Sequence, residues 1–280
     1  MVTLDERTWR STADRDVPTP LYVAADIHGH RSEFWESLRE AGLVDHTGHW
    51  SGGGALLWLL GDYVDRGPDG IGVINDIQRL AVSARAAGGH VGALLGNHEA
   101  QLLAAHRFGT MPVAGWDEPG GFRGGWVRFG GREKDLHQLT PQHVEWMTRL
   151  PAVAVVDGFL LVHSDTARYL ELGSSVAAVN SAVTTALASS DPAAWLDFCG
   201  RMSDRGAFRA AVRAHPDDPV SLMLRTLGGS VLVHGHSTLT KHFGVAPQDV
   251  TVALRYADDR VIAIDGGVHE GGRILLTRLR

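Results

Sequence analysis

The sequence contains a single cysteine, Cys199, and no long apolar run. One cysteine excludes an intrachain disulfide and a metal cluster built from several thiolates. Every apolar stretch is shorter than the roughly 18 residues that a membrane-spanning helix needs. Residues 1–20 are polar and lack the apolar core of a secretory signal. These absences predict a cytoplasmic protein with no membrane partner.

Basic residues are also sparse. Lys and Arg number 26 against 32 Asp and Glu, which leaves a formal net charge of −6, and no basic block is long enough to line a nucleic-acid groove. We therefore expect no nucleic-acid partner. The chain has 280 residues, of which 44% are hydrophobic and 21% charged, so it suits one large α/β domain or two small ones.

Histidine and glycine, by contrast, are abundant, with 15 and 34 residues. Histidine is the commonest metal ligand among the side chains, and glycine lets the backbone approach a ligand closely. The composition therefore draws attention to loops that combine the two residue types.

The chain is organised around GDYVDRG at residues 61–67, which follows the apolar run 55–60 and precedes a helix start at residues 68–70. Two carboxylates, Asp62 and Asp65, and the guanidinium of Arg66 thus occupy a tight loop at the end of a predicted buried strand. A buried strand positions such side chains rigidly, and the loop exposes them. This arrangement is suited to holding a cation and a phosphate together.

Two further apolar runs end in the same way. Residues 21–25 lead into DIHGH at residues 26–30, where we expect Asp26 and His28 to alternate on an extended chain and so point the same way. Residues 90–95 lead into GNHE at residues 96–99. Helical periodicity follows each loop, over residues 31–41, 71–87 and 100–106. Repeated strand–helix crossovers predict parallel strands covered by helices, with the polar loops gathered at one edge.

The second half of the chain is less regular. Residues 107–135 predict a long loop whose aromatic residues are more typical of a small satellite cluster than of a substrate platform. A hairpin over residues 152–162 leads into His163, and a strand over residues 230–233 leads into His234 and His236. The remaining predictions are a loosely packed leader at 1–20, helices in 167–228 with a break at 199–206, and strands at 250–256, 260–264 and 274–279.

Five predicted strand ends therefore carry polar side chains, namely Asp26 with His28, Asp62, Asn97 with His98, His163, and His236. A set of carboxylates, imidazoles and an amide suits Mn, Fe, Zn or Co better than Ca or Mg. The chain therefore predicts a site for a transition metal at the edge of the sheet.

DIHGH, GDYVDRG and GNHE, in this order and at these separations, resemble the phosphoprotein phosphatase branch of the calcineurin-like metallophosphoesterases. The three motifs are specific together, although each is weak alone. WSGG at residues 50–53 and Gly88-Gly89 are most similar to the bacterial Shewanella-like subgroup. The resemblance begins near Leu21 and is weakest in residues 107–150 and 167–228, which we expect to be substrate-shaping insertions in a single domain spanning 1–280. It implies an α/β fold, a four-layer αββα sandwich.

The resemblance also implies two divalent metal ions, with Mn favoured and Fe, Zn, Co and Ni as alternatives. Asp26 and His28 would hold the first metal, Asp62 would bridge both, and the second would be held by Asn97, His163 and His236. His98, oriented by Asp65, would protonate the leaving oxygen. Arg66 would grip the phosphate, and Asn97 would lie beside the substrate.

The chemistry supports these roles independently. Two metals about 3.5–4 Å apart clamp the attacking and leaving oxygens of an in-line displacement, and a metal lowers the pKa of its water toward about 7. A bridging hydroxide would then attack the phosphorus directly. The leaving group of a monoester still needs a proton, which a His–carboxylate pair can give, and an arginine can fork onto two phosphate oxygens. The predicted activity is a phosphatase that acts on a phosphoserine/threonine protein or a small phosphorylated metabolite.

Several assignments stay open at this stage. Leu95 stands where many protein phosphatases have arginine and where symmetrical dinucleoside tetraphosphate hydrolases have leucine, although those hydrolases usually have aspartate in place of Glu99. Hydrolysis of a dinucleoside polyphosphate is therefore the alternative activity. An inactive metal-binding interaction module is the alternative of another class, and it would require a damaged site, which the motifs do not show.

Some individual residues also have two interpretations. Arg201 and Arg205 are both candidates for a second arginine on the phosphate, and Asp65 could instead cap the following helix. His163 precedes Ser164-Asp165 where the family usually has Gly-Gly or Ala-Gly, so Asp165 could be a partner behind the ligands. We choose His236 over His234 as the ligand, and expect the other histidines of interest to lie on the surface or in loops: His30, His106 and His269.

Overall fold

The computed structural model describes residues 19–210 and 215–280, so the leader predicted over residues 1–20 lies outside the described part except for its last two residues. The strands are β1 (Leu21–Ala24), β2 (Leu56–Leu59), β3 (His90–Ala93), β4 (Val153–Val156), β5 (Phe159–Val162), β6 (Val231–His234), β7 (Leu254–Tyr256), β8 (Val261–Ala263) and β9 (Thr277–Arg278). The α-helices are α1 (Arg31–Glu40), α2 (Gly70–Ala86), α3 (Asn97–Phe108), α4 (Gly121–Arg128), α5 (Glu133–Gln138), α6 (Pro141–Thr148), α7 (Val176–Ala188), α8 (Pro192–Ser203), α9 (Pro219–Leu227) and α10 (Leu239–Phe243).

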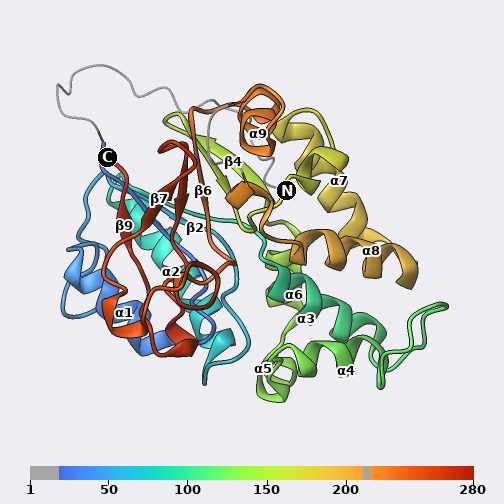
Figure 1. The fold of residues 1–280 in the computed structure, drawn as a ribbon. Coiled ribbons are helices and arrows are strands. Elements are labelled where there is room, and N and C mark those ends of the chain that lie inside the picture. The colour runs from blue at the N-terminus through green and yellow to red at the C-terminus, as the bar shows by residue number, and fades with distance from the viewer. Residues whose placement is uncertain (1–18, 211–214) are drawn as a thin grey trace.

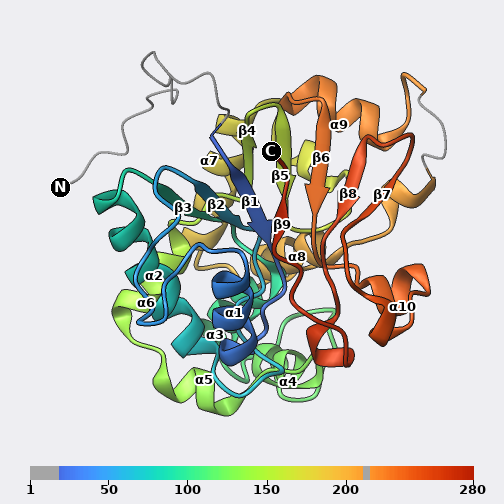
Figure 2. The ribbon, with the colours of Figure 1, turned by 90° about the vertical axis from the view of Figure 1, so that its left-hand side faces the viewer.

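These strands form two mixed sheets, ordered β3-β2-β1-β9 and β4-β5-β6-β8-β7. Strands β1, β2 and β3 are parallel, as are β5, β6 and β8, whereas the edge strands β4, β7 and β9 pair antiparallel. Figure 2 shows the two groups of strands side by side, with β1–β3 in blue and β6–β8 in orange and red. The predicted α/β class with parallel strands is confirmed.

The two sheets pack face to face through an apolar layer. Val23 of β1 faces this layer while its neighbour Ala24 faces the helices, and Leu161 and Leu160 of β5 divide in the same way. Alternate residues of a strand point to opposite faces, so a strand covered on both faces needs an unbroken apolar run. The layer consists of Val23, Ala25, Leu60, Leu94, Ala154, Leu161, Val233, Ile262 and Ile264.

Helices cover the outer faces of the pair of sheets. Helices α1 and α2 lie on the side of the first sheet and α7 on the side of the second, with both sheets between them (Figure 1). Helices α3 to α8 extend to one side of the sandwich. No helix of the described residues is long and apolar enough to cross a membrane. The interpretation of residues 1–280 as a single domain stays a prediction.

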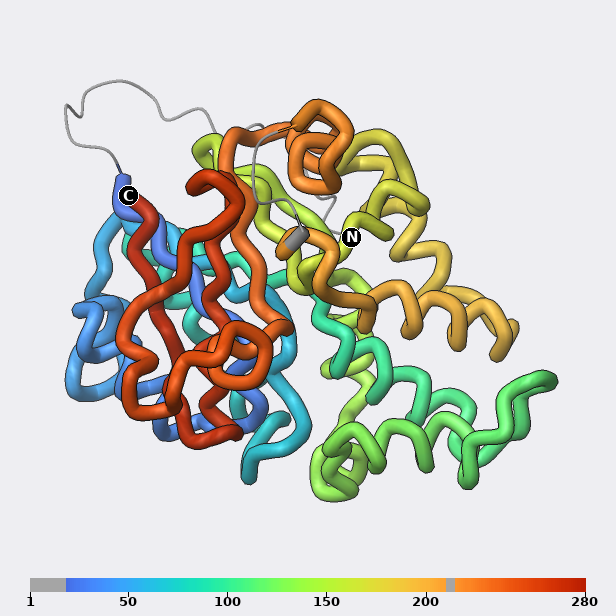
Figure 3. Tube along the Cα trace, in the orientation of Figure 1, coloured from blue at the N-terminus to red at the C-terminus, as the bar shows by residue number. Residues whose placement is uncertain are grey.

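The C-terminal strand β9 pairs with β1, with Val23 opposite Thr277. Figure 3 shows this red end of the chain running back alongside the blue N-terminal strand. The tail that joins β8 to β9 therefore passes the loop that follows β1, which brings residues 265–275 toward DIHGH.

The predicted long loop over residues 107–135 is wrong in part, because it contains helices α4 and α5. Phe122 and Trp126 are four residues apart and therefore share one face of α4, where both are buried. Phe122 packs against Phe108 and Trp116, with ring centroids 5.2 and 5.1 Å apart. The helical spacing of two aromatics outweighed the many glycines of the segment.

Two predicted boundaries also moved. Helix α3 begins at Asn97 and not at residue 100, so Asn97 and His98 lie in its first turn. Helix α8 continues through Cys199 to Ser203, which shortens the predicted break at 199–206. The helical content predicted for residues 167–228 is otherwise confirmed for the described residues.

We expect Gly96→Ala to lower the free energy of unfolding by about 1–3 kcal/mol, which is typical of overpacking. The φ of Gly96 is −90°, an ordinary value, but an added Cβ would lie only 2.3 Å from both the backbone N and Oδ1 of Asp62. Chemical denaturation would measure the change. The matched control is Gly200→Ala in α8, where an added Cβ meets nothing within 4 Å. This substitution should raise the free energy of unfolding by about 0.5–1 kcal/mol, because alanine is favoured over glycine inside a helix. Equal effects of the two substitutions would contradict the steric explanation.

Candidate active site

The predicted site residues meet where the carboxyl ends of the strands converge. Asp26 follows β1, Asp62 follows β2, Asn97 opens the helix after β3, His163 follows β5 and His236 follows β6. The first three come from one sheet and the last two from the other. The site therefore lies at one end of the sandwich, and both sheets contribute to it.

The loops that present these residues are sharply turned. Asp26 and His28 have φ values of 55° and 47°, so the extended chain predicted for them is wrong. Asp62, Asp65 and His236 also have positive φ, of 58°, 69° and 64°. Left-handed backbone is unfavourable for residues with a Cβ and persists only where surrounding contacts enforce it. The motifs therefore turn the backbone itself so that the side chains face inward.

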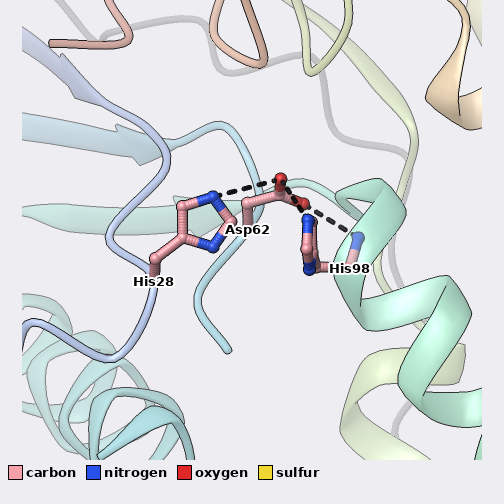
Figure 4. A group of neighbouring side chains, drawn as sticks. All are labelled: His28, Asp62 and His98. Atoms are coloured by element: carbon pink, nitrogen blue, oxygen red, sulfur yellow. Dashed lines mark hydrogen bonds and ion pairs between the residues drawn. The ribbon is translucent and has the colours of Figure 1, made fainter. Parts of the chain in front are cut away.

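One cluster contains His28, Asp62 and His98, whose nitrogen and oxygen atoms lie within 4.8 Å of one another. Figure 4 shows both imidazoles turned toward the Asp62 carboxylate. His28 Nε2 lies 3.6 Å from Asp62 Oδ2 and 3.9 Å from Asp26 Oδ1. His98 Nε2 lies 4.0 Å from Asp62 Oδ2, and its backbone N–H donates to Asp62 Oδ1 over 2.9 Å.

The orientation of the His28 ring is that of a metal-binding histidine. Its Nδ1 donates to the carbonyl of Val64 over 3.0 Å, so the lone pair of the ring is on Nε2. That Nε2 is buried and has no hydrogen-bond partner within the described residues, although it faces the carboxylates of Asp62 and Asp26. A lone pair directed at two carboxylates is unfavourable without a cation between them. The residues therefore fit a metal ion.

A second cluster contains Asp62, His163 and His236. His163 Nδ1 is 2.8 Å from the carbonyl of Leu60, so it donates there, and Nε2 faces Asp62 Oδ1 at 3.3 Å and Asn97 Oδ1 at 2.9 Å. His163 Nε2 thus lies close to oxygen atoms of both Asp62 and Asn97. Two clusters that share Asp62 suggest a binuclear site.

The electrostatics of the site agree with this interpretation. Burial alone would raise the pKa of Asp62, but the surrounding histidines outweigh burial and hold the pKa well below its usual value. Burial would lower the pKa of His163, yet Asp62 and Asp26 raise it to about 9. The carboxylates thus favour a positive charge at this position, and a metal ion bound to His163 would have to replace that proton. Burial chiefly lowers the pKa of His28 and of His236, which keeps both imidazoles neutral and able to bind a metal.

His98 and Asp65 form a buried pair beside the first cluster. His98 Nδ1 donates to Asp65 Oδ2 over 2.7 Å, and both side chains are at most 2% exposed. Asp65 therefore contacts an imidazole and does not cap α2, whose N-cap residue is Asp69. Arg66 Nη2 donates to His98 Nε2 over 3.1 Å. The structure thus brings together the three residues predicted to act on the leaving group and the phosphate.

The two arginines left open by the sequence lie in different surroundings. Arg201 donates to Glu171 and Asp197, each over 2.7 Å, on the surface of the helical insertion. Arg205 lies close enough to His236 for its charge to help lower the pKa of that imidazole, after burial and His163. Arg205 is exposed, and its Nη1 lies 3.1 Å from His242 Nε2. A contact of either arginine with the phosphate therefore stays a prediction.

The other residues considered in the sequence analysis lie around the site or away from it. His234 is buried and contacts Tyr256 Oη at 2.7 Å, which agrees with a structural role. Asp165 accepts from the Gly206 backbone N–H and from Ser237 Oγ, and so ties the insertion to the loop of His236. His106 is exposed as expected. His269 lies in a short turn of the tail and is partly exposed, and its Nε2 lies 2.6 Å from Arg66 Nη1, a contact that the sequence did not predict.

Sequence reasoning missed four further residues at the site. Glu99 accepts from the backbone N–H groups of Gly96, Asp62 and Tyr63, and its place three residues after the N-cap of α3 is a capping signal that could have revealed it. The others are brought in by long-range packing, and no local signal marks them: Trp126, Asp135 and His269.

Comparison with known proteins agrees with this geometry. A family model described as calcineurin-like phosphoesterase matches residues 19–238. Shewanella-like protein phosphatase 2 of Arabidopsis thaliana is 33% identical over 82 residues, which are 29% of this chain and 21% of the relative. A symmetrical bis(5'-nucleosyl)-tetraphosphatase of Buchnera aphidicola is 33% identical over 85 residues, or 30% of this chain and 26% of the relative. The chain thus matches only about a fifth to a quarter of the length of these two relatives.

Among solved structures, the cold-active protein-tyrosine phosphatase of a psychrophilic Shewanella species superposes with a TM-score of 0.65. The alignment has 20% identity and covers 92% of this chain and 75% of the other. Likeness at this identity concerns the fold, and it confirms the predicted sandwich of two sheets flanked by helices.

Proposed function

The chain belongs to the calcineurin-like phosphoesterase family, and on that premise we propose that it is a two-metal phosphatase that hydrolyses phosphomonoesters. The observation that carries the proposal is the sharing of Asp62 by two buried His/Asp clusters, beside the His98–Asp65 pair and Arg66. The resemblance to Shewanella-like protein phosphatase 2 supports phosphomonoesters as substrates. We propose a phosphorylated protein or small molecule as the substrate and the cytoplasm as the location.

The residues present would hold the metals as follows. Asp26, His28 and Asp62 would bind one ion, and Asp62, Asn97, His163 and His236 the other; manganese is the favoured metal. When bound, two such ions acidify water and stabilise the charge that develops on the phosphate oxygens. The side chains are held in place by the Val64 and Leu60 carbonyls, which accept from His28 and His163, so the ligands are preorganised.

His98 would supply the proton that the leaving oxygen needs. Asp65 accepts from His98 Nδ1, which fixes the ring and leaves Nε2 as the atom that faces the site. In this structure Nε2 accepts from Arg66, so Nε2 would take up the proton when Arg66 turns to the phosphate. That proton could then pass to an oxygen of the leaving group, while the Asp65 carboxylate holds the ring. Nearby, Arg66 would bind two phosphate oxygens, and Arg205 would approach from the loop after α8.

His269 would orient Arg66 for this task. We expect His269→Ala to raise KM about 3- to 10-fold and to weaken inhibition by inorganic phosphate by a similar factor, because Arg66 loses the acceptor that holds Nη1. His269→Gln keeps an acceptor and should restore most of the affinity. Steady-state kinetics with phosphate as inhibitor would measure both, and exposed His106→Ala serves as the control. An unchanged phosphate inhibition constant in His269→Ala would contradict this role.

Hydrolysis of a dinucleoside polyphosphate is the second candidate. Two observations favour it: Leu95 before GNHE, and the 33% identity to a symmetrical tetraphosphatase over 85 residues. Both activities would use the same metal ligands, so product analysis is needed to distinguish them.

The test is an assay of the purified protein with Mn²⁺ on p-nitrophenyl phosphate, a phosphoserine peptide, bis-p-nitrophenyl phosphate and diadenosine tetraphosphate. We expect turnover of the two monoesters that a chelator abolishes and that added Mn²⁺ restores. Release of ADP from the dinucleotide with slow monoester turnover would instead support the second candidate. Metal binding without turnover of any substrate would overturn the proposal in favour of an inactive metal-binding module.

A further inference from the structure

We propose that Trp126 is a positioning residue for the His98–Asp65 acid pair, supplied by the segment that the sequence predicts as a loop. This inference rests on the proposed function, since it concerns protonation of the leaving group. It assigns a role to helix α4, which lies outside the three sequence motifs.

The indole N–H of Trp126 donates directly to the Asp65 carboxylate. Nε1 donates to Asp65 Oδ1 over 2.9 Å and to Oδ2 over 2.8 Å, while His98 Nδ1 donates to Oδ2 over 2.7 Å. Trp126 is 1% exposed and Asp65 is fully buried. The carboxylate therefore lies between two ring N–H groups, and one of them belongs to the proposed acid.

The same segment holds the backbone of the GDYVDRG loop. Asp135 Oδ2 accepts from the backbone N–H of Asp65 over 3.0 Å, and the carbonyl of Gly130 accepts from the backbone N–H of Arg66 over 2.8 Å. A Cβ on Gly131 would lie 2.3 Å from two atoms of the Trp126 ring, so the backbone packs closely on the indole. Residues 126–135 thus contact both the carboxylate and the two backbone groups beside it.

This arrangement has a specific chemical consequence. Without the indole donor, the Asp65 carboxylate can rotate about its terminal bond, because that torsion is broad. Rotation would tilt the His98 ring and move Nε2 away from the leaving oxygen, and proton transfer depends steeply on such alignment. The metal clusters do not include Trp126. Loss of the donor should therefore impair only substrates whose leaving group must be protonated.

Trp126→Phe tests this inference because it keeps an aromatic ring and removes the N–H. The p-nitrophenolate ion leaves without a proton, whereas an alkoxide requires one. We expect kcat/KM on p-nitrophenyl phosphate to fall less than about 3-fold, and kcat on an alkyl phosphate or phosphoserine peptide to fall about 10-fold or more, as for loss of a hydrogen bond to a charged group. Binding of Mn²⁺ should be unchanged.

The matched control is Trp116→Phe in the same segment, where the half-buried indole packs on Phe122. It should show no dependence on the leaving group. If Trp126 acts through Asp65, the Trp126→Phe/Asp65→Asn double variant should be no slower on alkyl phosphates than Asp65→Asn alone. If Trp126→Phe does not fold, Trp126→Met is measured in the same way.

Two results separate the inference from the proposed function. Equal losses on both substrate types in Trp126→Phe would overturn the positioning role, since a purely structural residue would affect them alike. A lack of leaving-group dependence in His98→Asn would instead overturn the acid role of His98, on which the inference depends. Selective loss in His98→Asn together with equal losses in Trp126→Phe would leave the proposed function intact and refute only the role of Trp126.

Discussion

Asp62→Asn is expected to lower kcat/KM on every phosphoester by on the order of 10³-fold or more, because both clusters lose their shared charge. Asp62 Oδ2 faces His28 Nε2 at 3.6 Å and Oδ1 faces His163 Nε2 at 3.3 Å, so one carboxylate serves both sites. The amide is nearly isosteric but neutral, and it offers one oxygen where two are needed. Calorimetric titration with Mn²⁺ should show loss or severe weakening of binding at both sites.

Asp69→Asn is the matched control. Asp69 lies in the same loop but pairs with Arg31 over 3.1 Å, on the side of α1 and α2. Its substitution should leave metal binding and turnover close to those of the unaltered protein. Retention of two bound Mn²⁺ ions by a folded Asp62→Asn variant would show that the metals bind elsewhere, and every role proposed for the site would fail with that result.

His98→Asn is expected to lower kcat on alkyl phosphates about 10²- to 10⁴-fold, the usual contribution of a general acid. The loss on p-nitrophenyl phosphate should be much smaller. The side chain is buried, and its Nδ1 donates to Asp65. Among the described residues, no other imidazole hydrogen-bonds to that carboxylate. Kinetics over a series of leaving groups would measure the difference.

Metal titration adds a second readout for His98. This histidine also belongs to the first cluster, with Nε2 4.0 Å from Asp62 Oδ2, so its geometry alone would allow it to bind a metal. As a proton donor, His98 can be replaced without loss of Mn²⁺. A large fall in metal affinity with equal losses on all leaving groups would identify it as a ligand and refute its role as an acid. Exposed His106→Asn in the same helix is the control.

The predicted ligand set came together because each residue directly follows a strand. Asp26, Asp62 and Asn97 follow three apolar runs whose parallel pairing could be inferred from the intervening helices, so their convergence followed from local pattern and chain connectivity. The geometry of the loops could not be inferred in this way. The positive φ values of Asp26 and His28 depend on tertiary contacts. In one of these, the His28 backbone N–H donates to the carbonyl of Asp62, 34 residues away in the chain, over 2.9 Å.

The helical segments show a second limit. Glycine-rich composition predicted a loop over residues 107–135. Instead, Phe122 and Trp126 are buried at helical spacing on α4, and Phe122 packs against Phe108 of α3. His269 was expected on the surface or in a loop, and its contact with Arg66 was not foreseen, because it depends on the antiparallel pairing of β9 with β1, which carries this segment past DIHGH. In both cases the deciding contact joins segments far apart in the chain.

The sequence by itself determined which chemical groups stand at the strand ends, because an apolar run and the polar loop after it are neighbours in the chain. Only the tertiary structure decided that these strands divide into two sheets, that Asp62 faces histidines from both, and that Trp126, Asp135 and His269 surround the acid pair and Arg66. The physical reason is that hydrophobic periodicity reports which face of an element is buried. The partner that buries that face is set by packing of the whole chain.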